Sequence, residues 1–203
     1  MKIYWIRHSE AQDDLNNCYG GAADWDLTEG GAKKVESFRP TFEKFGIEKL
    51  YASPLKRAFK TAEILNKNTE IPLEKVFKLH EANHYGYLTG LEKNLAKELF
   101  AYLPEYQNAT YYNRRCFPGG ETPDALDKRI ATVIKNIISK SEGLKTIGIV
   151  THGGVTRSFF WNLLKDKRKL ENIGDVAYAE INFVNGKFEL VKTEGIKFGG
   201  TSS

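Results

Sequence analysis

The sequence predicts an α/β fold of three layers, in which a mainly parallel sheet carries helices on both faces and ends in an antiparallel hairpin at one edge. Two apolar runs, residues 3–6 and 146–151, are typical of buried strands, and a histidine follows closely on each. Segments with helical spacing of apolar residues separate the strand-like runs. Near the C-terminus, residues 179–190 alternate in polarity and turn at Asn185-Gly186, which indicates a β-hairpin.

The length of 203 residues suits one domain, which we expect to span residues 1–198, with a lid-like insertion around 82–120 and a flexible tail over 199–203. The chain has 30 basic and 26 acidic residues, a net charge of +4, and the basic residues are dispersed. This balance favours a local anion pocket over a nucleic-acid surface. No apolar run approaches a membrane span, and because the chain enters its first strand at once we expect no signal peptide.

The only two cysteines are Cys18 and Cys116, which have no metal-ligand spacing. A reduced, cytoplasmic protein is the simplest interpretation, although one disulfide between them is also compatible with the sequence.

The first long helix is predicted to begin at a Thr28 cap and to end at Gly46. A polar loop over residues 10–26 precedes it and leaves the end of the first strand directly. The core-facing residues of this helix are Val35, Phe38, Phe42 and Phe45. Pro40 lies inside the pattern and predicts a kink or a break there.

A second strand over residues 49–52 is followed by Ser53-Pro54, which predicts a helix start with Ser53 as the cap. Arg57 then falls in the first turn, from which its guanidinium can reach the strand ends. A third strand is predicted over residues 76–79, and it leads into an irregular loop that carries Glu81.

Residues 92–117 combine a short helix with a tyrosine-rich stretch that includes Arg114 and Arg115. This stretch could cover a site as a lid or could pack as ordinary surface, and the sequence does not decide between the two. After it, Thr122-Pro123 predicts another helix start, and a second helix is expected after His152.

Five polar side chains are predicted to converge at the carboxyl ends of the strands, where open α/β sheets bind their ligands. They are Arg7, His8, Arg57, Glu81 and His152. Neutral imidazole can attack phosphorus, and fixed arginines can hold and neutralise phosphoryl oxygens. A carboxyl group can give a proton to the leaving alkoxide and later deprotonate water. The set therefore suits phosphoryl transfer without a metal ion.

Two other interpretations stay open on the residues alone. Each histidine, taken singly, is more often a hydrogen-bonded structural residue than a catalyst. A metal site formed by His8, Glu10 and His152 is the second possibility, and turnover that is sensitive to a chelator would favour it.

Several blocks of the sequence, in order over nearly the whole chain, match the motifs of one known family. They are Arg7-His8-Ser9-Glu10, Leu27-Thr28-Glu29, residues 53–62 beginning Ser53-Pro54, Gly119-Gly120-Glu121-Thr122 and Thr151-His152-Gly153-Gly154. In these blocks the chain resembles the histidine phosphatase superfamily, in its phosphoglycerate mutase-like branch. The resemblance implies that His8 accepts the phosphoryl group, that Arg7, Arg57 and His152 bind phosphate, and that Glu81 donates the proton. Asp14, Gly153, Arg114 and Arg115 are further candidates for binding substrate.

Three positions depart from the family pattern. Ser9 replaces the usual glycine after the nucleophile, which affects the local backbone geometry. Asp14 stands where many members have an asparagine that touches the phosphoryl group, and its carboxylate would repel phosphate unless it is paired or protonated. Cys18 stands where an arginine is common in mutases and sugar bisphosphatases.

We therefore expect a metal-independent phosphatase that acts on a small phosphomonoester and needs no cofactor. A cofactor-dependent phosphoglycerate mutase is the nearest alternative, because residues 79–86 and the pair Arg114-Arg115 resemble mutase segments. The shorter chain and the fewer anion-binding residues after His8 favour the phosphatase. A non-catalytic protein that binds a phospholigand is the contrasting class. Hydrolysis of an aryl phosphate that is lost in His8→Ala discriminates between enzyme and binder.

Overall fold

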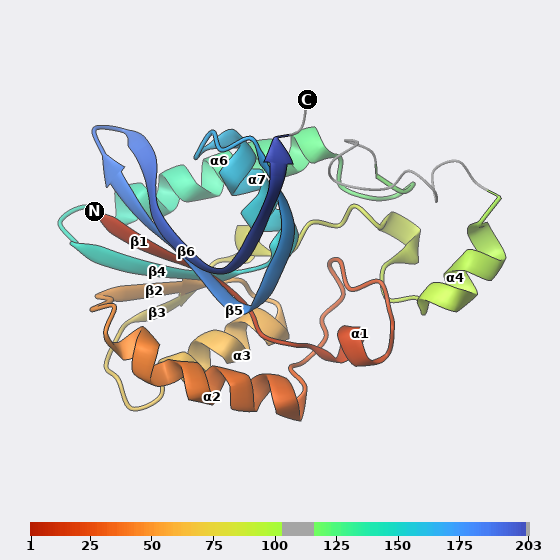
Figure 1. The fold of residues 1–203 in the computed structure, drawn as a ribbon, viewed down its shortest axis with the longest axis horizontal. Helices are drawn as coiled ribbons and strands as arrows, with labels where there is room; N and C mark the ends of the chain where they lie inside the picture. The colour runs from red at the N-terminus through yellow and green to blue at the C-terminus, as the bar shows by residue number, and fades with distance from the viewer. Residues whose placement is uncertain (103–115, 202–203) are drawn as a thin grey trace.

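The computed structural model describes residues 1–102 and 116–201, and in these residues six strands form one sheet in the order β3-β2-β4-β1-β5-β6 (Figure 1). The strands are β1 (Lys2–Arg7), β2 (Lys49–Ala52), β3 (Leu73–Lys75), β4 (Thr146–Thr151), β5 (Arg168–Val184) and β6 (Lys187–Thr201). The first four in sheet order pair in parallel, whereas β5 pairs antiparallel with β1 and with β6. The predicted mainly parallel sheet with an antiparallel C-terminal edge is confirmed.

Helices cover both faces of the sheet, with α2 and α3 on one face and α6 and α7 on the other (Figure 1). The helices are α1 (Gln12–Leu15), α2 (Glu29–Glu43), α3 (Lys56–Leu65), α4 (Lys93–Phe100), α6 (Pro123–Lys140) and α7 (Gly153–Asn162), with 3₁₀ turns η1 (Phe77–Leu79) and η2 (Gly86–Leu88). The predicted caps Thr28 and Thr122 each accept a hydrogen bond from the first turn of their helix, α2 and α6 respectively.

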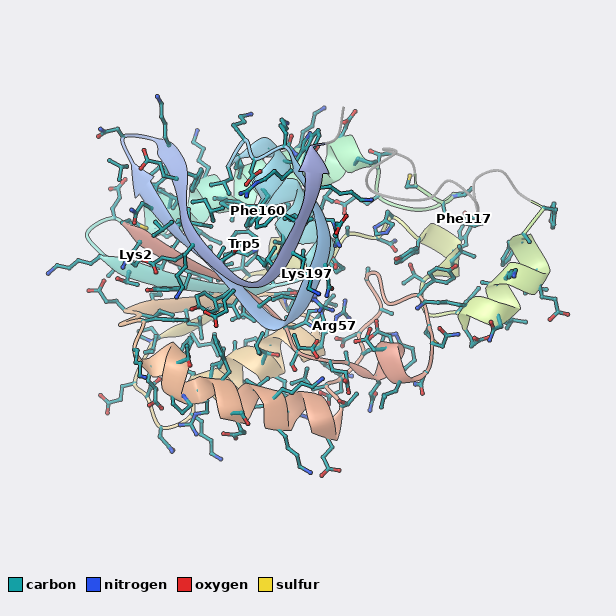
Figure 2. The ribbon with its side chains drawn as sticks, in the orientation of Figure 1. Lys2, Trp5, Arg57, Phe117, Phe160 and Lys197 are labelled. Carbon is teal, nitrogen blue, oxygen red and sulfur yellow. The ribbon has the colours of Figure 1, made fainter. Side chains whose placement is uncertain are left out.

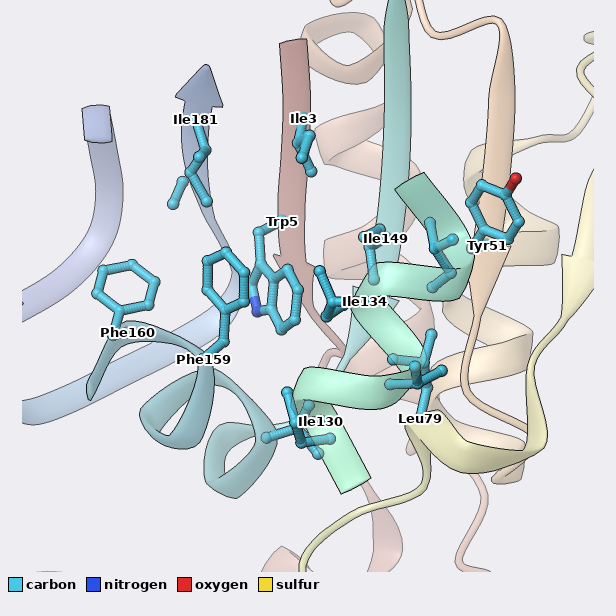
Figure 3. Packing of buried hydrophobic residues seen from close by; sticks show 14 of the residues in the cluster. Ile3, Trp5, Tyr51, Leu79, Ile130, Ile134, Ile149, Phe159, Phe160 and Ile181 are labelled. Carbon is cyan, nitrogen blue, oxygen red and sulfur yellow. The ribbon is translucent and has the colours of Figure 1, made fainter. Parts of the chain in front are cut away.

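Alternation along β1 divides the apolar side chains between the two faces. The Trp5 ring stacks on Phe159 of α7, with 4.2 Å between the ring centroids (Figure 3). On the other face, Tyr4 stacks on Phe45, which follows α2, with 3.9 Å between the centroids. One buried strand therefore ties both helical layers to the sheet and fixes the direction in which β1 ends.

The register of the parallel strands brings the two predicted histidines together. Arg7 pairs with Thr151 across β1 and β4, so His8 and His152 both follow the same level of the sheet. The backbone N–H of His8 donates to the Thr151 carbonyl at 2.9 Å. Both imidazoles consequently emerge at one rim, at the carboxyl ends of β1 and β4.

Two helix predictions need correction. The break that was one of the two outcomes expected at Pro40 does not occur, because α2 continues to Glu43. Pro40 lies in the last turn and removes one hydrogen bond to the preceding turn, and burial of Phe42 keeps the last turn against the core. Ser53 does not cap the next helix, because α3 begins at Lys56 after Leu55. The Ser53 hydroxyl instead lies 2.6 Å from His152 Nε2.

Two strand predictions were also wrong in their bounds. The third strand lies at Leu73–Lys75, and residues 77–79 form the turn η1, which carries the fully buried Leu79 into the core. The hairpin turns at Asn185-Gly186 as expected, but its strands extend well beyond residues 179–190. Residues 199–201, expected to be part of a flexible tail, belong to β6, because Thr201 pairs with Arg168.

The described part of the insertion around 82–120 has its own small cluster of buried side chains. Leu88, Ala96 and Phe117 form this cluster, and Phe117 lies apart from Trp5 and Phe160 of the main core (Figure 2). Among the described residues, none of the helices is long and apolar enough to cross a membrane.

Candidate active site

A cavity of about 660 Å³ opens where β1 and β4 end. Its lining includes Arg7, His8, Asp14, Arg57, Glu81 and Gly153, all of which the sequence singled out. The cavity thus brings together residues from both halves of the chain. His152 is not on this lining, because it is fully buried, but its ring contacts that of His8. The candidates Arg114 and Arg115 lie outside the described residues.

The His8 ring is held in one tautomer by its own loop. His8 Nδ1 lies 2.6 Å from the carbonyl oxygen of Ser9. A carbonyl only accepts hydrogen bonds, so Nδ1 carries the proton and Nε2 keeps a lone pair. The Nε–H of Arg57 donates to this Nε2 at 3.2 Å. The lone pair therefore faces the guanidinium in the cavity.

Both imidazoles are buried and electrically neutral. Burial lowers the pKa of His8 well below its ordinary value of 6.5, and the charges of Arg7 and Arg57 lower that pKa further. Burial likewise lowers the pKa of His152 well below 6.5, with a further contribution from Arg57. The two rings meet edge to face, with 4.9 Å between their centroids. At neutral pH each ring can act as a nucleophile or as a hydrogen-bonding group.

Arg57 is buried, with only 2% of its surface exposed, and it is held rigidly. Its Nη1 donates to the Ala23 carbonyl at 2.7 Å, and its Nη2 donates to the Gly21 carbonyl at 2.8 Å. Burial lowers the pKa of Arg57, while the nearby carboxylates of Glu81 and Asp13 oppose that change. The loop before α2 therefore fixes the plane of the guanidinium through its own carbonyl groups.

His152 is bound at one nitrogen and unpaired at the other. Nε2 lies 2.6 Å from Ser53 Oγ. Nδ1 is buried and has no hydrogen-bond partner among residues 1–102 and 116–201. A buried ring nitrogen without a partner is costly, which makes it a position where a ligand atom can bind.

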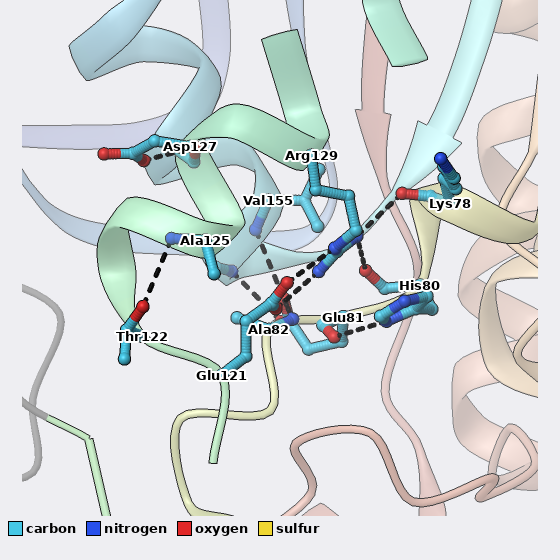
Figure 4. A network of polar contacts seen from close by, with 12 residues as sticks. Lys78, His80, Glu81, Ala82, Glu121, Thr122, Ala125, Asp127, Arg129 and Val155 are labelled. Carbon is cyan, nitrogen blue, oxygen red and sulfur yellow. Dashed lines mark hydrogen bonds and ion pairs between the residues drawn. The ribbon is translucent and has the colours of Figure 1, made fainter. Parts of the chain in front are cut away.

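Glu81 is fixed by backbone groups at the start of α7 (Figure 4). Its carboxylate accepts hydrogen bonds from the N–H groups of Ala82 at 2.7 Å, Gly154 at 3.0 Å and Val155 at 3.2 Å. A Cβ on Gly154 would lie 2.7 Å from Glu81 Oε1, so this close approach requires a residue without a side chain. The loop that carries Glu81 is thus locked to the helix that follows His152.

A second contact anchors the same loop from α6 (Figure 4). Arg129 binds both carboxylate oxygens of Glu121, at 2.7 and 2.6 Å. It also donates to the carbonyls of Lys78 and His80, at 2.7 and 3.0 Å. This bidentate pair fixes the backbone immediately before Glu81.

The departures at positions 9, 14 and 18 have different structural consequences. Ser9 is buried and does not have a positive φ, so a side chain causes no left-handed strain there. Asp14 Oδ2 accepts a hydrogen bond from the Ala11 N–H at 3.1 Å, while the residue still lines the cavity. Cys18 lines the cavity too, and it is a free thiol.

The arrangement of Glu10 does not fit the alternative metal site with the two histidines. Its carboxylate accepts hydrogen bonds from Thr28 Oγ1 at 2.7 Å and from Lys34 Nζ at 2.9 Å. Among the described residues, His, Cys, Asp and Glu side chains form no group of three or more that could hold a metal ion.

The model of the histidine phosphatase superfamily, branch 1, matches residues 3–194. The chain belongs to the histidine phosphatase superfamily. Among its sequence relatives, a 2,3-bisphosphoglycerate-dependent phosphoglycerate mutase from Streptococcus thermophilus is 32% identical over 158 residues, 71% of this chain and 66% of the mutase. That match spans just under two thirds of the mutase. Phosphoglycerate mutase-like protein 4 from Arabidopsis thaliana is 31% identical over 177 residues, 85% of this chain and 75% of that protein.

Solved structures of phosphatases share the fold of this chain. The alpha-ribazole phosphatase from Shigella flexneri superposes with a TM-score of 0.82 at 20% identity, covering 95% of this chain and 96% of its own. A phosphoserine phosphatase mutant from Entamoeba histolytica, in complex with phosphoserine, superposes with a TM-score of 0.74 at 23% identity, covering 95% of each chain.

Sequence reasoning missed several residues that line the cavity. They are Asp13, His84, Tyr85, Lys93 and Arg157. Asp13 and Lys93 were hidden in polar segments that look like solvated surface. The signal for Arg157 was its position four residues after Gly153 on the same helix, since residues four apart share a helix face.

Proposed function

We propose that this histidine phosphatase hydrolyses a small phosphomonoester, without a metal ion, through a phosphohistidine formed on His8. The observation that carries the proposal is the His8 ring, with its Nδ1 proton held by the Ser9 carbonyl at 2.6 Å and its Nε2 lone pair beside Arg57. In the first step Nε2 attacks phosphorus, an N–P bond forms, and the P–O bond to the leaving alkoxide breaks.

Arg7, Arg57 and His152 are proposed to hold the phosphoryl oxygens during this transfer. Charge stays on these oxygens throughout the reaction, so donors fixed in advance lower the barrier without reorganising. If the Ser53 hydroxyl donates to His152 Nε2, the His152 proton stays on Nδ1, the buried atom without a partner among the described residues. That proton is then available to a phosphoryl oxygen.

Glu81 is proposed as the group that protonates the leaving alkoxide. The same carboxylate then takes a proton from the water that attacks the phosphohistidine, which releases inorganic phosphate and restores Nε2. Its three backbone donors, Ala82, Gly154 and Val155, support this role because they fix the carboxylate beside the cavity. Gly153 and Asp14 are proposed to contact the substrate from the cavity wall.

The carboxylates of Asp13 and Asp14 support hydrolysis over mutase chemistry. Both residues line the cavity, and a mutase must hold a second phosphate there. Each carboxylate opposes such an additional anion by charge repulsion. Burial raises the pKa of Asp13, which reflects the cost of keeping this charge in the cavity.

A phosphoglycerate mutase is the second candidate, and specific observations favour it. Lys93 and Arg157 add cationic groups to the cavity, and relatives at 31–32% identity carry mutase names. Product analysis with 3-phosphoglycerate, in the presence and absence of 2,3-bisphosphoglycerate, separates the two. Release of inorganic phosphate supports the phosphatase, whereas conversion to 2-phosphoglycerate supports the mutase.

We also propose that the described part of the segment around 82–120 covers the cavity as a lid, because Tyr85, Leu88 and Lys93 reach the cavity from it. A cytoplasmic location is proposed on the evidence of Cys18 and Cys116, which are both free thiols.

The test is hydrolysis of p-nitrophenyl phosphate by the whole chain. We expect turnover that His8→Ala abolishes and that a chelator leaves unchanged. Lys187→Ala is the control, because Lys187 is exposed and does not line the cavity. Turnover that persists in His8→Ala contradicts the proposal, and binding of phosphate without turnover of any phosphomonoester supports the non-catalytic alternative.

A further inference from the structure

The guanidinium of Arg7 is bound by two groups of β5, a strand that is distant from Arg7 in sequence. Arg7 Nη1 donates to the Ile173 carbonyl at 2.6 Å and lies 3.5 Å from Asp175 Oδ1. Ile173 also lines the cavity, beside Arg7 itself. Two acceptors from β5 thus engage one nitrogen of the guanidinium, a charge-assisted arrangement that restricts a flexible side chain.

Asp175 is itself held from the opposite side. Its Oδ2 lies 2.8 Å from Lys34 Nζ of α2, and Lys34 Nζ also lies 2.9 Å from Glu10 Oε2. The hydrogen bonds with Asp175 and Glu10 raise the pKa of Lys34, so its ammonium stays charged. The Asp175 carboxylate therefore bridges two cations, one on the cavity wall and one outside it.

The backbone that presents these acceptors is irregular. Between the pairs Ile173↔Ile196 and Tyr178↔Glu194, β5 advances from residue 173 to 178 while β6 advances only from 196 to 194. Three extra residues on β5 form this bulge. Within the bulge, Val176 has a φ of 48°, a left-handed conformation that is a true outlier for a β-branched residue.

Strained backbone persists only where surrounding contacts enforce it, and such positions concentrate at functional sites. Here Val176 packs against the core on one side of the sheet. The residues that precede it, Ile173 and Asp175, contact Arg7. Packing of Val176 against the core therefore holds the bulge in place. The bulge in turn holds the Ile173 carbonyl and the Asp175 carboxylate next to Arg7 at the cavity.

We propose that Asp175 is a positioning residue for Arg7, and that the bulge over residues 173–178 exists to present it. This inference rests on the proposed function, in which Arg7 holds phosphoryl oxygens. Because acceptors on β5 bind Nη1, the other N–H donors of the guanidinium already have a fixed orientation before substrate binds. Pre-organisation of this kind lowers the ordering cost of binding and keeps the charge in place in the transition state.

The experiment is a double-mutant cycle on the whole chain, with Arg7→Ala, Asp175→Asn and the combined variant. The readouts are kcat/KM for p-nitrophenyl phosphate and the dissociation constant of inorganic phosphate. Asp175→Asn keeps the size of the side chain and removes its charge. In the native background we expect it to lower kcat/KM and to raise the dissociation constant of phosphate, each by roughly 10- to 100-fold, because a small misplacement of a binding group costs up to that amount.

In the Arg7→Ala background, Asp175→Asn should have no further effect. Asp166→Asn is the matched control, since Asp166 pairs with Arg168 outside the cavity, and it should leave both readouts unchanged. Equal losses from Asp175→Asn in both backgrounds would show a general structural role and overturn the inference. No loss in the native background would overturn it too.

A rescue experiment keeps the inference testable if Asp175→Asn also lowers the melting temperature. Free guanidinium ion should restore part of the lost activity or phosphate affinity in Arg7→Ala, because the Ile173 carbonyl and the Asp175 carboxylate remain to bind it. The same ion should restore roughly tenfold less in Arg7→Ala/Asp175→Asn. Equal rescue in both variants would show that Asp175 does not bind the guanidinium ion and would contradict the inference. If the native chain shows no turnover that depends on His8, the proposed function is wrong. The coupling between Arg7 and Asp175 can still be measured in that case by phosphate binding.

Discussion

Arg57 Nε lies 3.2 Å from His8 Nε2 and donates a hydrogen bond to its lone pair. The contact joins the first strand of the sheet to helix α3 and sets the state of the ring. A cation at this distance stabilises neutral imidazole against protonation, and it also stands where the oxygens of a phosphoryl group would need neutralising. The same residue thus prepares the nucleophile and the anion site.

Replacing Arg57 should therefore change His8 directly. We predict that Arg57→Ala raises the pKa of His8 toward its ordinary value, because one of the charges that lower it is removed. Turnover should fall by roughly 10²- to 10³-fold, the usual effect of losing a fixed donor at such a centre. Titration of the His8 ring by NMR measures the pKa. Arg168→Ala, outside the cavity, should leave the His8 titration unchanged.

The buried neutral histidines also predict how stability depends on pH. His8 and His152 have folded pKa values well below 6.5, so the unfolded chain binds more protons than the folded chain as the pH falls. The free energy of unfolding should therefore be highest above pH 6.5 and decline below it, by about 1.4 kcal/mol per pH unit for each histidine that stays neutral.

Urea denaturation between pH 7.5 and about 5.5 measures this decline. His8→Gln should reduce the slope by the contribution of one histidine, since glutamine does not titrate. Stability that is flat over this range in the native chain, or a slope that His8→Gln leaves intact, contradicts the assignment of a depressed pKa to His8.

Removal of the Glu81 carboxylate should affect substrates according to their leaving groups. Glu81→Gln should lower turnover of alkyl phosphates by roughly 10²- to 10⁴-fold, because a poor leaving group needs the proton. Phosphoryl transfer from p-nitrophenyl phosphate, measured as the pre-steady-state burst, should fall much less. Glu142→Gln, on an exposed residue, should leave both rates unchanged. Equal losses for both kinds of substrate would argue against a proton donor at this position.

Gly154 provides a steric test of how Glu81 is held. A Cβ at Gly154 would lie 2.7 Å from Glu81 Oε1 and 2.9 Å from the Ala82 Cβ. Gly154→Ala should displace the carboxylate, lower turnover and cost about 1–3 kcal/mol of stability through overpacking.

Gly30→Ala is the matched control for this substitution. A Cβ at Gly30, inside α2, makes only ordinary contacts of 3.6 and 3.7 Å. It should preserve activity and stabilise the helix by roughly 0.5–1 kcal/mol. Turnover and melting temperature, compared between the two alanine variants, check the prediction. Full activity in Gly154→Ala would mean that the contact with Glu81 is not needed.

The layers of the fold and the convergence of His8 and His152 could be predicted because they depend on local patterns. Apolar runs define the parallel strands, and parallel strands place their carboxyl ends at one edge. Ser53 shows where local patterns fail. Its sequence context predicts a helix cap, but the hydroxyl contacts His152, a residue 99 positions away. Only the folded chain brings His152 within reach of this hydroxyl.

The contacts between Arg7 and β5 could not be predicted from the sequence for the same reason. Nothing local to Ile173 or Asp175 indicates a contact with residue 7, and a bulge depends on how two long strands pair. Val176, a β-branched residue, locally favours an extended conformation rather than the left-handed one that it adopts. Asp13 on α1 and Arg157 on α7 likewise meet at the cavity only because the fold brings these two helices to its wall.

The most direct test of the proposed chemistry is to trap the phosphoryl group on the enzyme. The chain would be mixed rapidly with p-nitrophenyl phosphate, quenched in alkali, which preserves phosphohistidine, and digested for mass spectrometry. We predict a phosphoryl group on the peptide that contains His8, formed as fast as p-nitrophenol is released in the burst. Turnover without any phosphorylated peptide, or with the group on a residue other than His8, would contradict the account.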